Sequence, residues 1–173
     1  MVYINNHYRF IFIENPKSGS SAILKGLEKA LKIKINRGSP KQAHLTVDQV
    51  KNMYQDKWKN YLKVTTQRDP FQRFCSSINY EPHRLNHCFN LEQLQKHLKN
   101  PNGCVYCKPQ SEFTKECDFI IDMNNSQSNF NDFCKRVGLP VTQLTMENKS
   151  KKRFYTTEQL STIYKLSFTT QTN

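Results

Sequence analysis

The residues whose types and spacing could do chemistry begin with a short loop of small side chains that carries Lys17. The loop follows an apolar run from Phe10 to Ile13, and apolar residues then recur at the spacing of one helix face from Ile23 to Leu31. Gly19 and the hydroxyl residues around it would let consecutive backbone N–H groups converge on an anion at the start of that helix, where the dipole favours negative charge. We therefore predict a strand, a phosphate-binding loop and a helix.

The order of residues in this loop differs from that of the Walker A motif, in which the lysine comes late and follows the glycines. Here Lys17 precedes Gly19. A short Gly/Ser turn between a strand and a helix also occurs where nothing binds, so the loop alone leaves a purely structural role open.

A second segment adds a cationic group at the end of another predicted strand. Residues 61–66 are rich in β-forming side chains, and Arg68 follows them directly before a proline that can open a helix. A guanidinium suits a phosphate dianion, and the Ser76 hydroxyl, further along that helix, could complete the shell around it. For Arg73 we expect an ion pair with Asp69, four residues earlier on the same helix.

Together the two segments resemble the cofactor motifs of sulfotransferases that use 3′-phosphoadenosine 5′-phosphosulfate (PAPS). Pro16 to Ser21 is similar to the Pro-Lys-Thr-Gly-Gly/Thr-Thr loop, and Arg68 to Ser76 is similar to the Arg-Asp/Asn-Pro-aromatic-x-Arg-x-x-Ser motif of the carbohydrate type. Near the end of the chain, residues 148–155 resemble the family's basic cofactor-covering loop. The cofactor-binding residues that the resemblance implies, with Arg68 and Ser76 at the 3′-phosphate, are Lys17, Ser18, Gly19, Ser20, Ser21, Ala22, Arg68, Ser76, Ser150 and Arg153.

His44 is the predicted general base. It lies just ahead of a helix start that Thr46 and Gln49 would close as a capping box. An imidazole titrates near the operating pH, and the resemblance places a catalytic histidine at this position. Without the resemblance, a helix-cap or packing role for His44 would be the better interpretation. Other candidate bases are Glu14 and, more weakly, His83, His87 and His97.

Further elements extend the resemblance over nearly the whole chain. Lys108 to Phe113 and Asp118 to Ile121 are similar to the family's Pro-Gln and Asp-Phe-Ile elements. The chain also departs from the pattern, because Tyr106 stands where relatives often have a histidine and Ser167 where an aspartate is common. We expect these differences to bear on the acceptor more than on the cofactor.

Length and composition set the remaining bounds. The 173 residues predict a single sulfotransferase-like domain over 1–173. No secretory signal and no run of 18 apolar residues is visible, which predicts a cytoplasmic protein or a trimmed catalytic domain. The 26 Lys and Arg against 14 Asp and Glu give a net charge of +12, which favours polyanionic partners. Nucleic-acid binding would depend on this charge alone, because no zinc-finger, RRM or helix-turn-helix signature is present.

The six cysteines raise the alternative of a metal site. Cys104 and Cys107 have the spacing of half a zinc site, and His83, His87 and Cys88 lie upstream. Sulfuryl transfer needs no metal, and the pattern of residues 91–99 between these groups indicates a helix, so we predict no metal. Three further cysteines have apolar neighbours and are predicted to be core thiols: Cys75, Cys117 and Cys134.

Strands and helices alternate along the chain. This order predicts an α/β protein with a P-loop-like three-layer fold, in which a mostly parallel central sheet is flanked by helices. Ligands of such sheets bind beyond the carboxyl ends of the strands, where both phosphate motifs fall. The predicted strands are 9–14, 32–35, 61–66 and 117–121, and the predicted helices are 20–32, 46–55, 70–79, 91–99, 126–137 and 156–167.

The sequence thus predicts a PAPS-dependent sulfotransferase that acts on a hydroxyl of a carbohydrate, with an anionic acceptor favoured. Lys17 would serve the leaving 5′-phosphate and His44 would take the proton. Two alternatives stay open: a catalytically silent polyanion-binding module with the same fold, and a nucleotide-dependent kinase-like enzyme. The loop order and the lack of a recognisable acidic, metal-holding strand end disfavour the kinase.

Overall fold

The computed structural model describes residues 1–36, 44–80, 108–145 and 155–168. The chain divides into two compact units, which are considered separately. The first, here called the sheet unit, comprises Met1–Arg68 and Pro109–Glu147. The second, the helical unit, comprises Asp69–Lys108 and Asn148–Asn173.

Four strands form the sheet of the sheet unit in the order β1-β2-β3-β4. Strands β2 (Phe10–Ile13), β3 (Leu62–Gln67) and β4 (Phe119–Asp122) are parallel, so their carboxyl ends lie at one edge of the sheet. Strand β1 (Val2–Asn5) pairs antiparallel with β2. The predicted α/β class with a mostly parallel sheet is therefore confirmed, but the N-terminal strand was not predicted.

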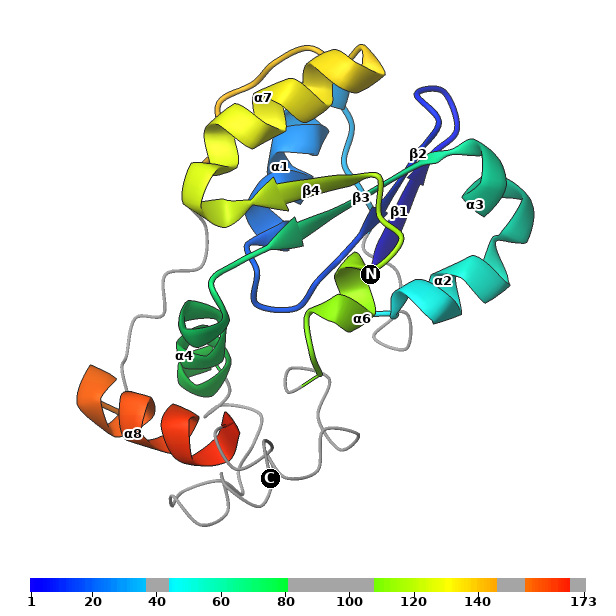
Figure 1. The fold of residues 1–173 in the computed structure, drawn as a ribbon. Coiled ribbons are helices and arrows are strands. Elements are labelled where there is room, and N and C mark those ends of the chain that lie inside the picture. Colours follow the sequence, from blue (N-terminus) through cyan, green and yellow to red (C-terminus); the bar gives the residue numbers. More distant parts are fainter. Residues whose placement is uncertain (37–43, 81–107, 146–154, 169–173) are drawn as a thin grey trace. The chain divides into compact units, whose positions relative to one another are not determined.

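Helices cover both faces of this sheet (Figure 1). On one face, Phe10 and Phe12 pack with side chains of α1 (Ser20–Leu31) and α7 (Ser126–Val137). On the other, Ile11 and Ile13 pack with Val47, Val50 and Trp58 of α2 (Val47–Met53) and α3 (Gln55–Asn60). All four residues of β2 are buried because the strand has an apolar layer on each side. The arrangement is that of a three-layer α/β fold.

The structure differs from the sequence-based expectation at three places in the sheet unit. Residues 32–35 form no strand: Lys32 ends α1 in the left-handed conformation, and the Ile35 N–H donates to Glu28 Oε1 (3.0 Å) instead of to a strand. The predicted helix 46–55 is confirmed as α2, whereas α3, which begins after Tyr54 leaves the helical conformation, was not predicted. The one-turn helix α6 (Ser111–Thr114) was not predicted.

In the helical unit, the described residues form two helices, α4 (Pro70–Tyr80) and α8 (Thr157–Phe168). They pack through a small apolar cluster centred on Phe74, Leu160 and Ile163. A capping box begins α8, since Thr156 N donates to Gln159 Oε1 (2.9 Å) and Gln159 N donates to Thr156 Oγ1 (3.2 Å). The predicted helix 91–99 lies outside the described residues. Across the described ranges, no helix has the length and apolar character needed to cross a bilayer.

Candidate functional site

The loop between β2 and α1 has the geometry of an anion-binding turn. Lys17 and Gly19 both have positive φ, at 61° and 79°. Gly19 is the N-cap of α1, and among the described residues no side chain caps the first turn of this helix. The N–H of Ala22 donates to Gly19 O (3.0 Å), so the amides of Ser20 and Ser21 are the better placed to receive an anion. Lys17 is half-buried beside them.

Gly19 is favoured by its positive φ, and it lies against Met123 of the 3-10 helix η3 (Met123–Asn125), which follows β4. A Cβ at this position would meet the end of the Met123 side chain, at Cε and Sδ, which would have to move. Glycine therefore allows both the left-handed turn and the close packing of η3 against the loop.

Ser18 and Ser20 turn their side chains into the protein. Ser18 Oγ donates to Asn15 O (2.7 Å) and lies 2.7 Å from Thr66 Oγ1. Ser20 Oγ donates to Asn15 O (2.9 Å) and lies 2.8 Å from Thr66 Oγ1. Three hydroxyl protons serve these four contacts, so one proton is shared. The predicted roles of Ser18 and Ser20 toward a cofactor are thereby restricted to their backbone amides, while their side chains fix the loop to β3.

Asn15, just before the loop, is fully buried and links it to the end of β3. Its Nδ2 donates to Thr66 O (2.9 Å) and to Gln110 Oε1 (3.3 Å). Among the described residues its Oδ1 has no hydrogen-bond partner. Asn15 was not predicted as a site residue, although an asparagine between a buried strand and Pro16 is a signal that could have suggested a buried amide.

Arg68 directly follows β3, so its main chain lies at the same edge of the sheet as the Lys17 loop. Gln110 holds this main chain: Arg68 N donates to Gln110 Oε1 (3.1 Å), and Gln110 Nε2 donates to Arg68 O (2.8 Å). The structure thus places two of the predicted phosphate-binding segments at neighbouring strand ends. Gln110 belongs to the Pro-Gln element, but no role was predicted for it.

His44 lies beside the same loop. Its imidazole hydrogen-bonds to the Glu14 main chain, and the charges of Glu14 and Lys17 act on it. Burial lowers the pKa of His44 below its usual value, and the Glu14 carboxylate opposes this shift. The positive charges of the N-terminal ammonium group and, less strongly, of Lys17 also lower the pKa. His44 also has positive φ (58°), which is uncommon for a residue other than glycine. The two predicted catalytic residues, His44 and Lys17, are thus close enough for their charges to interact.

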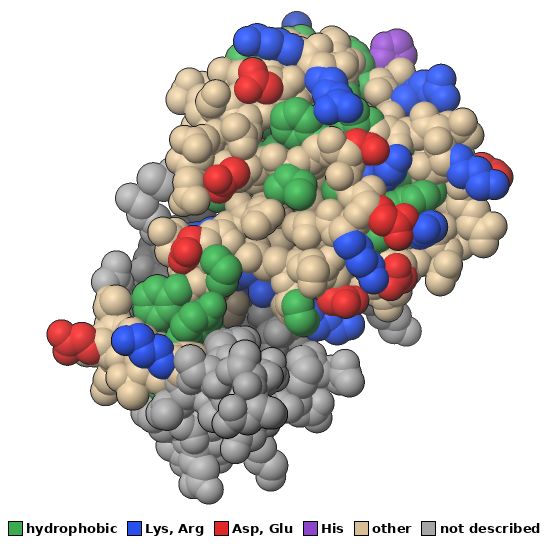
Figure 2. Space-filling view, in the orientation of Figure 1, with side chains coloured by type: hydrophobic (Ala, Val, Ile, Leu, Met, Phe, Trp, Pro, Cys, Tyr) green, Lys and Arg blue, Asp and Glu red, His purple; other side chains and the backbone are tan. Residues whose placement is uncertain are grey.

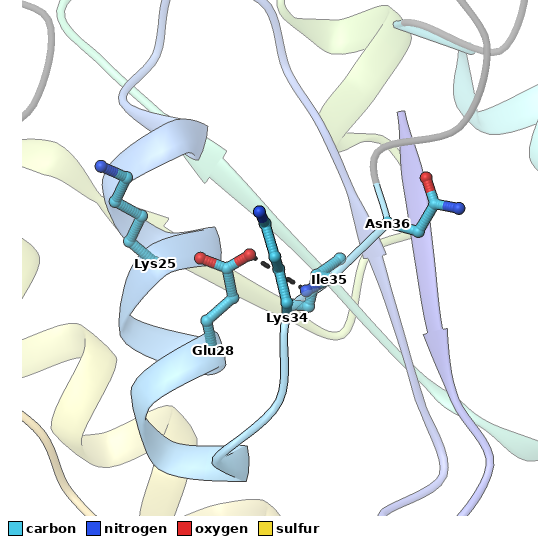
Figure 3. A pocket seen from close by; sticks show the side chains of 5 residues that line it. All are labelled: Lys25, Glu28, Lys34, Ile35 and Asn36. Atoms are coloured by element: carbon cyan, nitrogen blue, oxygen red, sulfur yellow. Dashed lines mark hydrogen bonds between the residues drawn. The ribbon is translucent and has the colours of Figure 1, made fainter.

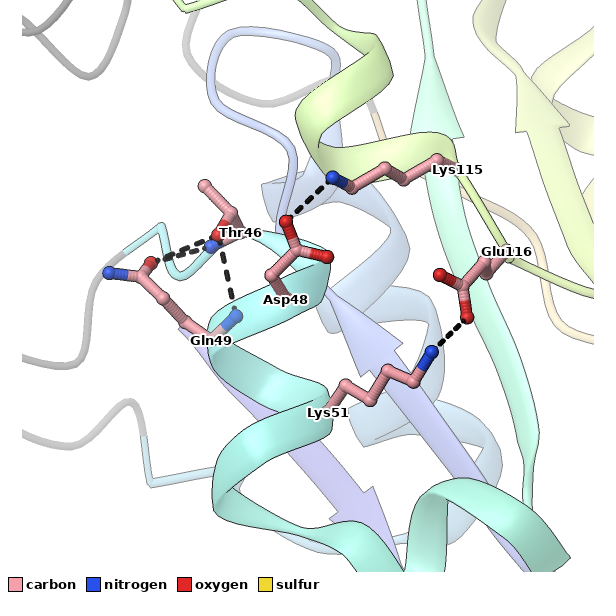
Figure 4. A network of polar contacts seen from close by, with 6 residues as sticks. All are labelled: Thr46, Asp48, Gln49, Lys51, Lys115 and Glu116. Carbon is pink, nitrogen blue, oxygen red and sulfur yellow. Dashed lines mark hydrogen bonds and ion pairs between the residues drawn. The ribbon is translucent and has the colours of Figure 1, made fainter.

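The helix that follows His44 is fixed at its start and along its side (Figure 4). Thr46 and Gln49 form the predicted capping box. Two exposed ion pairs then join α2 to the end of α6, Lys115 Nζ to Asp48 Oδ2 (2.6 Å) and Lys51 Nζ to Glu116 Oε2 (2.7 Å). Helix α2 is thus tied, through α6, to the segment that carries Gln110.

The other predicted cofactor residues are distributed differently. Ser76 lies half-buried on α4 of the helical unit. Arg73, on the same helix, is buried and its Nη1 donates to Lys108 O (2.9 Å), whereas its predicted ion pair with Asp69 stays a prediction. Ser150 and Arg153 lie outside the described residues, as do Tyr106 and the alternative bases His83, His87 and His97.

The cysteines in the described part of the chain have no features of a reactive or metal site. Cys134 is a core thiol as predicted, and Cys75 and Cys117 are half-buried at the edges of apolar clusters. Burial raises the pKa of Cys117 to about 12 and that of Cys134 to about 11. Within the described ranges, no group of three or more His, Cys, Asp or Glu residues could hold a metal ion. The predicted zinc alternative at residues 83–107 lies outside those ranges.

A cavity of about 520 Å³ lies away from these residues, along the outer side of α1 (Figure 3). Its lining residues come from α1 and from the chain that follows this helix, and Glu28 accepts a hydrogen bond from the Ile35 main chain at its wall. None of the predicted catalytic or cofactor-binding residues is among those that line it: Lys25, Glu28, Lys34, Ile35 and Asn36.

Comparisons of the chain with protein-family models, with curated proteins and with solved structures gave no significant match. The function of this chain must therefore be inferred from its own residues and their geometry.

Proposed function

We propose that this protein is a PAPS-dependent sulfotransferase that transfers a sulfuryl group to a hydroxyl of a carbohydrate acceptor. The observation that carries the proposal is that the Lys17 loop, with its uncapped helix start, and the main chain of Arg68 lie at neighbouring strand ends, on the carboxyl edge of the sheet. Such an edge is where ligands of parallel sheets bind. His44 is close enough to Lys17 for their charges to interact.

In the proposed reaction, an acceptor oxygen attacks the sulfur of PAPS in line with the bond to the 5′-phosphate. The acceptor O–S bond forms, the S–O bond to the 5′-phosphate breaks, and adenosine 3′,5′-bisphosphate leaves. His44 takes the proton of the acceptor hydroxyl. Lys17 and the amides at the start of α1 stabilise the negative charge that grows on the leaving phosphate.

The lowered pKa of His44 supports this role, because a base must be neutral before it can accept a proton. Because burial lowers the pKa of His44, its imidazole stays neutral down to a lower pH than that of an exposed histidine. Turnover should then be lost on the acid side of that lowered pKa. Replacement by asparagine keeps a residue type that tolerates positive φ and removes the titrating group.

The net charge of +12 supports an anionic acceptor, such as an acidic or already sulfated saccharide. On the face shown in Figure 2, Lys and Arg side chains are interspersed with Asp and Glu. The attraction should therefore be moderate in range, and the apparent acceptor affinity should weaken as ionic strength rises.

The first test compares nucleotides. The wild type should bind adenosine 3′,5′-bisphosphate more tightly than adenosine 5′-monophosphate, and without Mg²⁺. Lys17→Ala and Arg68→Ala should each weaken binding by about 1.5–3 kcal/mol, the scale of hydrogen bonds to charged groups. Only the Arg68→Ala effect should disappear when the 3′-phosphate is removed. Lys59→Ala, on the exposed side of α3, removes the same charge away from the site and is the control.

The second test measures transfer of labelled sulfuryl from PAPS to a panel of saccharides, phenols and sterols. His44→Asn should lower turnover by about 10²-fold while leaving bisphosphate affinity nearly unchanged. Transfer to phenols alone would overturn the carbohydrate acceptor. Bisphosphate binding with no transfer to any acceptor would favour the silent binding module.

Binding of ATP distinguishes the kinase-like alternative from the sulfotransferase. Strand β4 does end in an acidic residue, Asp122, but its Oδ1 accepts the N–H of Asn124 and so caps η3. A kinase would bind ATP more tightly than the bisphosphate and only with Mg²⁺. That result would overturn the sulfotransferase proposal.

A further inference from the structure

Gln110 makes a two-point contact with the Arg68 main chain. Its Oε1 accepts from Arg68 N at 3.1 Å and its Nε2 donates to Arg68 O at 2.8 Å. A neighbouring strand would offer the same donor and acceptor to this residue. The last pair of β3 with β4 is Gln67 with Asp122, so Arg68 is the first residue beyond that pairing. The Gln110 amide therefore continues the pairing of β3 by one residue.

Gln110 is itself firmly placed. It is the N-cap of α6, and Phe113, in the first turn of that helix, is fully buried. The two ion pairs from α2 reach the chain directly after this helix, at Lys115 and Glu116. A side chain anchored in this way can transmit its position to the main chain that it contacts.

We propose that Gln110 is a positioning residue that holds the main chain of Arg68 and thereby sets the preference of the site for a nucleotide with a 3′-phosphate. This inference rests on the proposed function. It assigns to Gln110 a role in selecting the nucleotide, by fixing the base from which the Arg68 side chain extends, and no contact of Gln110 with the ligand.

The hydrogen-bond distances indicate which part of the site Gln110 should affect most. Its contact with Asn15 Nδ2, which leads to the Lys17 loop, is 3.3 Å, longer than either contact with Arg68. The loop is also held by Ser18, Ser20 and Thr66 independently of Gln110. Loss of Gln110 should therefore disturb the Arg68 side of the site much more than the Lys17 side.

The test uses Gln110→Met, which keeps the length of the side chain and removes both hydrogen-bonding groups. Titration calorimetry on the full chain should show adenosine 3′,5′-bisphosphate binding weakened about tenfold, on the scale of one or two hydrogen bonds, and adenosine 5′-monophosphate binding weakened less than about twofold. Gln110→Glu keeps the acceptor and loses the donor, so it should give an intermediate change. Gln55→Met makes the same substitution at an exposed position of α3 and should change neither affinity.

A double-mutant cycle with Arg68→Ala distinguishes positioning of Arg68 from a general structural role of Gln110. If Gln110 acts through Arg68, Gln110→Met should have almost no further effect on bisphosphate affinity in the Arg68→Ala background. Hydrogen exchange should show faster exchange of the Arg68 amide in Gln110→Met, with the amides of α1 unchanged.

The outcomes separate the inference from the proposed function. A wild type that shows no preference for the 3′-phosphate overturns the Arg68 assignment, and the inference with it. A wild type that has the preference, together with a Gln110→Met variant that keeps it or loses affinity for both nucleotides equally, overturns the inference and leaves the proposed function standing. Full additivity in the cycle also overturns it.

Discussion

The chain after β2 and the chain after β3 end at the same edge of the sheet, but they are held differently. The first, residues 15–20, is fixed mainly by its own side chains, because Ser18 and Ser20 bind Asn15 O and meet the Thr66 hydroxyl. The second, at Arg68, is fixed by Gln110, which comes from a helix start 42 residues later in the chain. Side chains of the first segment bind both its own main chain and Thr66, whereas the Arg68 main chain is bound at two points by a side chain from another element.

This difference matters for what each segment can do. A loop held by several buried contacts keeps its amides aimed at one point, as a site for a leaving phosphate requires. A main-chain segment that one side chain binds at two points should be loosened when that side chain is changed. The comparison predicts that substitutions of the side chains that hold the first segment, those of Asn15, Ser18 and Ser20, act mainly on folding. Substitutions at Gln110 should act mainly on ligand preference.

The largest effect on folding is expected for Asn15→Asp. The new carboxylate oxygen would replace Nδ2 and face two acceptors, Thr66 O and Gln110 Oε1, in a fully buried position. A buried charge without a donor is costly, so the free energy of unfolding should fall by about 3 kcal/mol, measured by urea denaturation. Asn129→Asp is the matched control, because Asn129 uses its oxygen, which accepts from Asp122 N, and aspartate keeps that bond. Equal losses in the two variants would contradict the argument.

Gly19→Ala should have the next largest effect, about 2 kcal/mol, since alanine is strained at φ 79° and its Cβ meets Met123. Gly138 has nearly the same φ, 78°, and a Cβ added there would meet nothing within 4 Å, so Gly138→Ala should cost about 1 kcal/mol from strain alone. In a Met123→Ala background, Gly19→Ala should fall to the Gly138→Ala level. No change in that background would show that Met123 does not restrict the loop.

Much of the fold could be predicted because its signals are local. The buried run at Phe10 to Ile13, the helix-face spacing after Gly19 and the two capping boxes each lie within a few residues. Strand β1 was missed because its pairing with β2 depends on the turn that joins the two strands. In this turn Tyr8 N donates to Asn5 Oδ1 (2.9 Å), and Arg9 has positive φ. Residues 32–35 have a β-like pattern but form no strand, because the Ile35 N–H donates to the Glu28 side chain of α1.

The candidate site, like the fold, could be predicted only where its signals are local. Lys17, Arg68 and His44 could be named from motifs, and the sheet order places Lys17 and Arg68 at neighbouring strand ends. The inward direction of Ser18 and the roles of Asn15 and Gln110 could not be foreseen, because they depend on contacts between residues 42 to 95 positions apart. Such pairings follow from the packed sheet and not from local spacing.

A smaller effect is expected for Thr66→Val, which keeps the shape of the side chain and removes the hydroxyl that both serines meet. The free energy of unfolding should fall by about 1.5 kcal/mol, because Ser18 and Ser20 keep Asn15 O as an acceptor. Thr65→Val removes a single bond, from Thr65 Oγ1 to Ile13 O (2.8 Å), and should cost about half as much. A larger loss from Thr65→Val would show that the hydroxyls below the loop contribute little to holding it.

The smallest effect is expected for His44, on which the charges of Glu14 and Lys17 act. Because burial lowers its pKa in the folded protein, the unfolded chain binds more protons between that pKa and the ordinary value of 6.5. The contribution of His44 to stability is therefore full above about pH 6.5 and is lost as the pH falls through the lowered folded pKa. Urea denaturation of the wild type and of His44→Asn at several pH values should show a difference in unfolding free energy that favours the wild type less at low pH. The opposing pull of the Glu14 carboxylate keeps this difference small. Since the other ionisable groups are common to both proteins, a difference that stays constant with pH, or grows in favour of the wild type in acid, would mean that His44 is not held neutral beside the Lys17 loop.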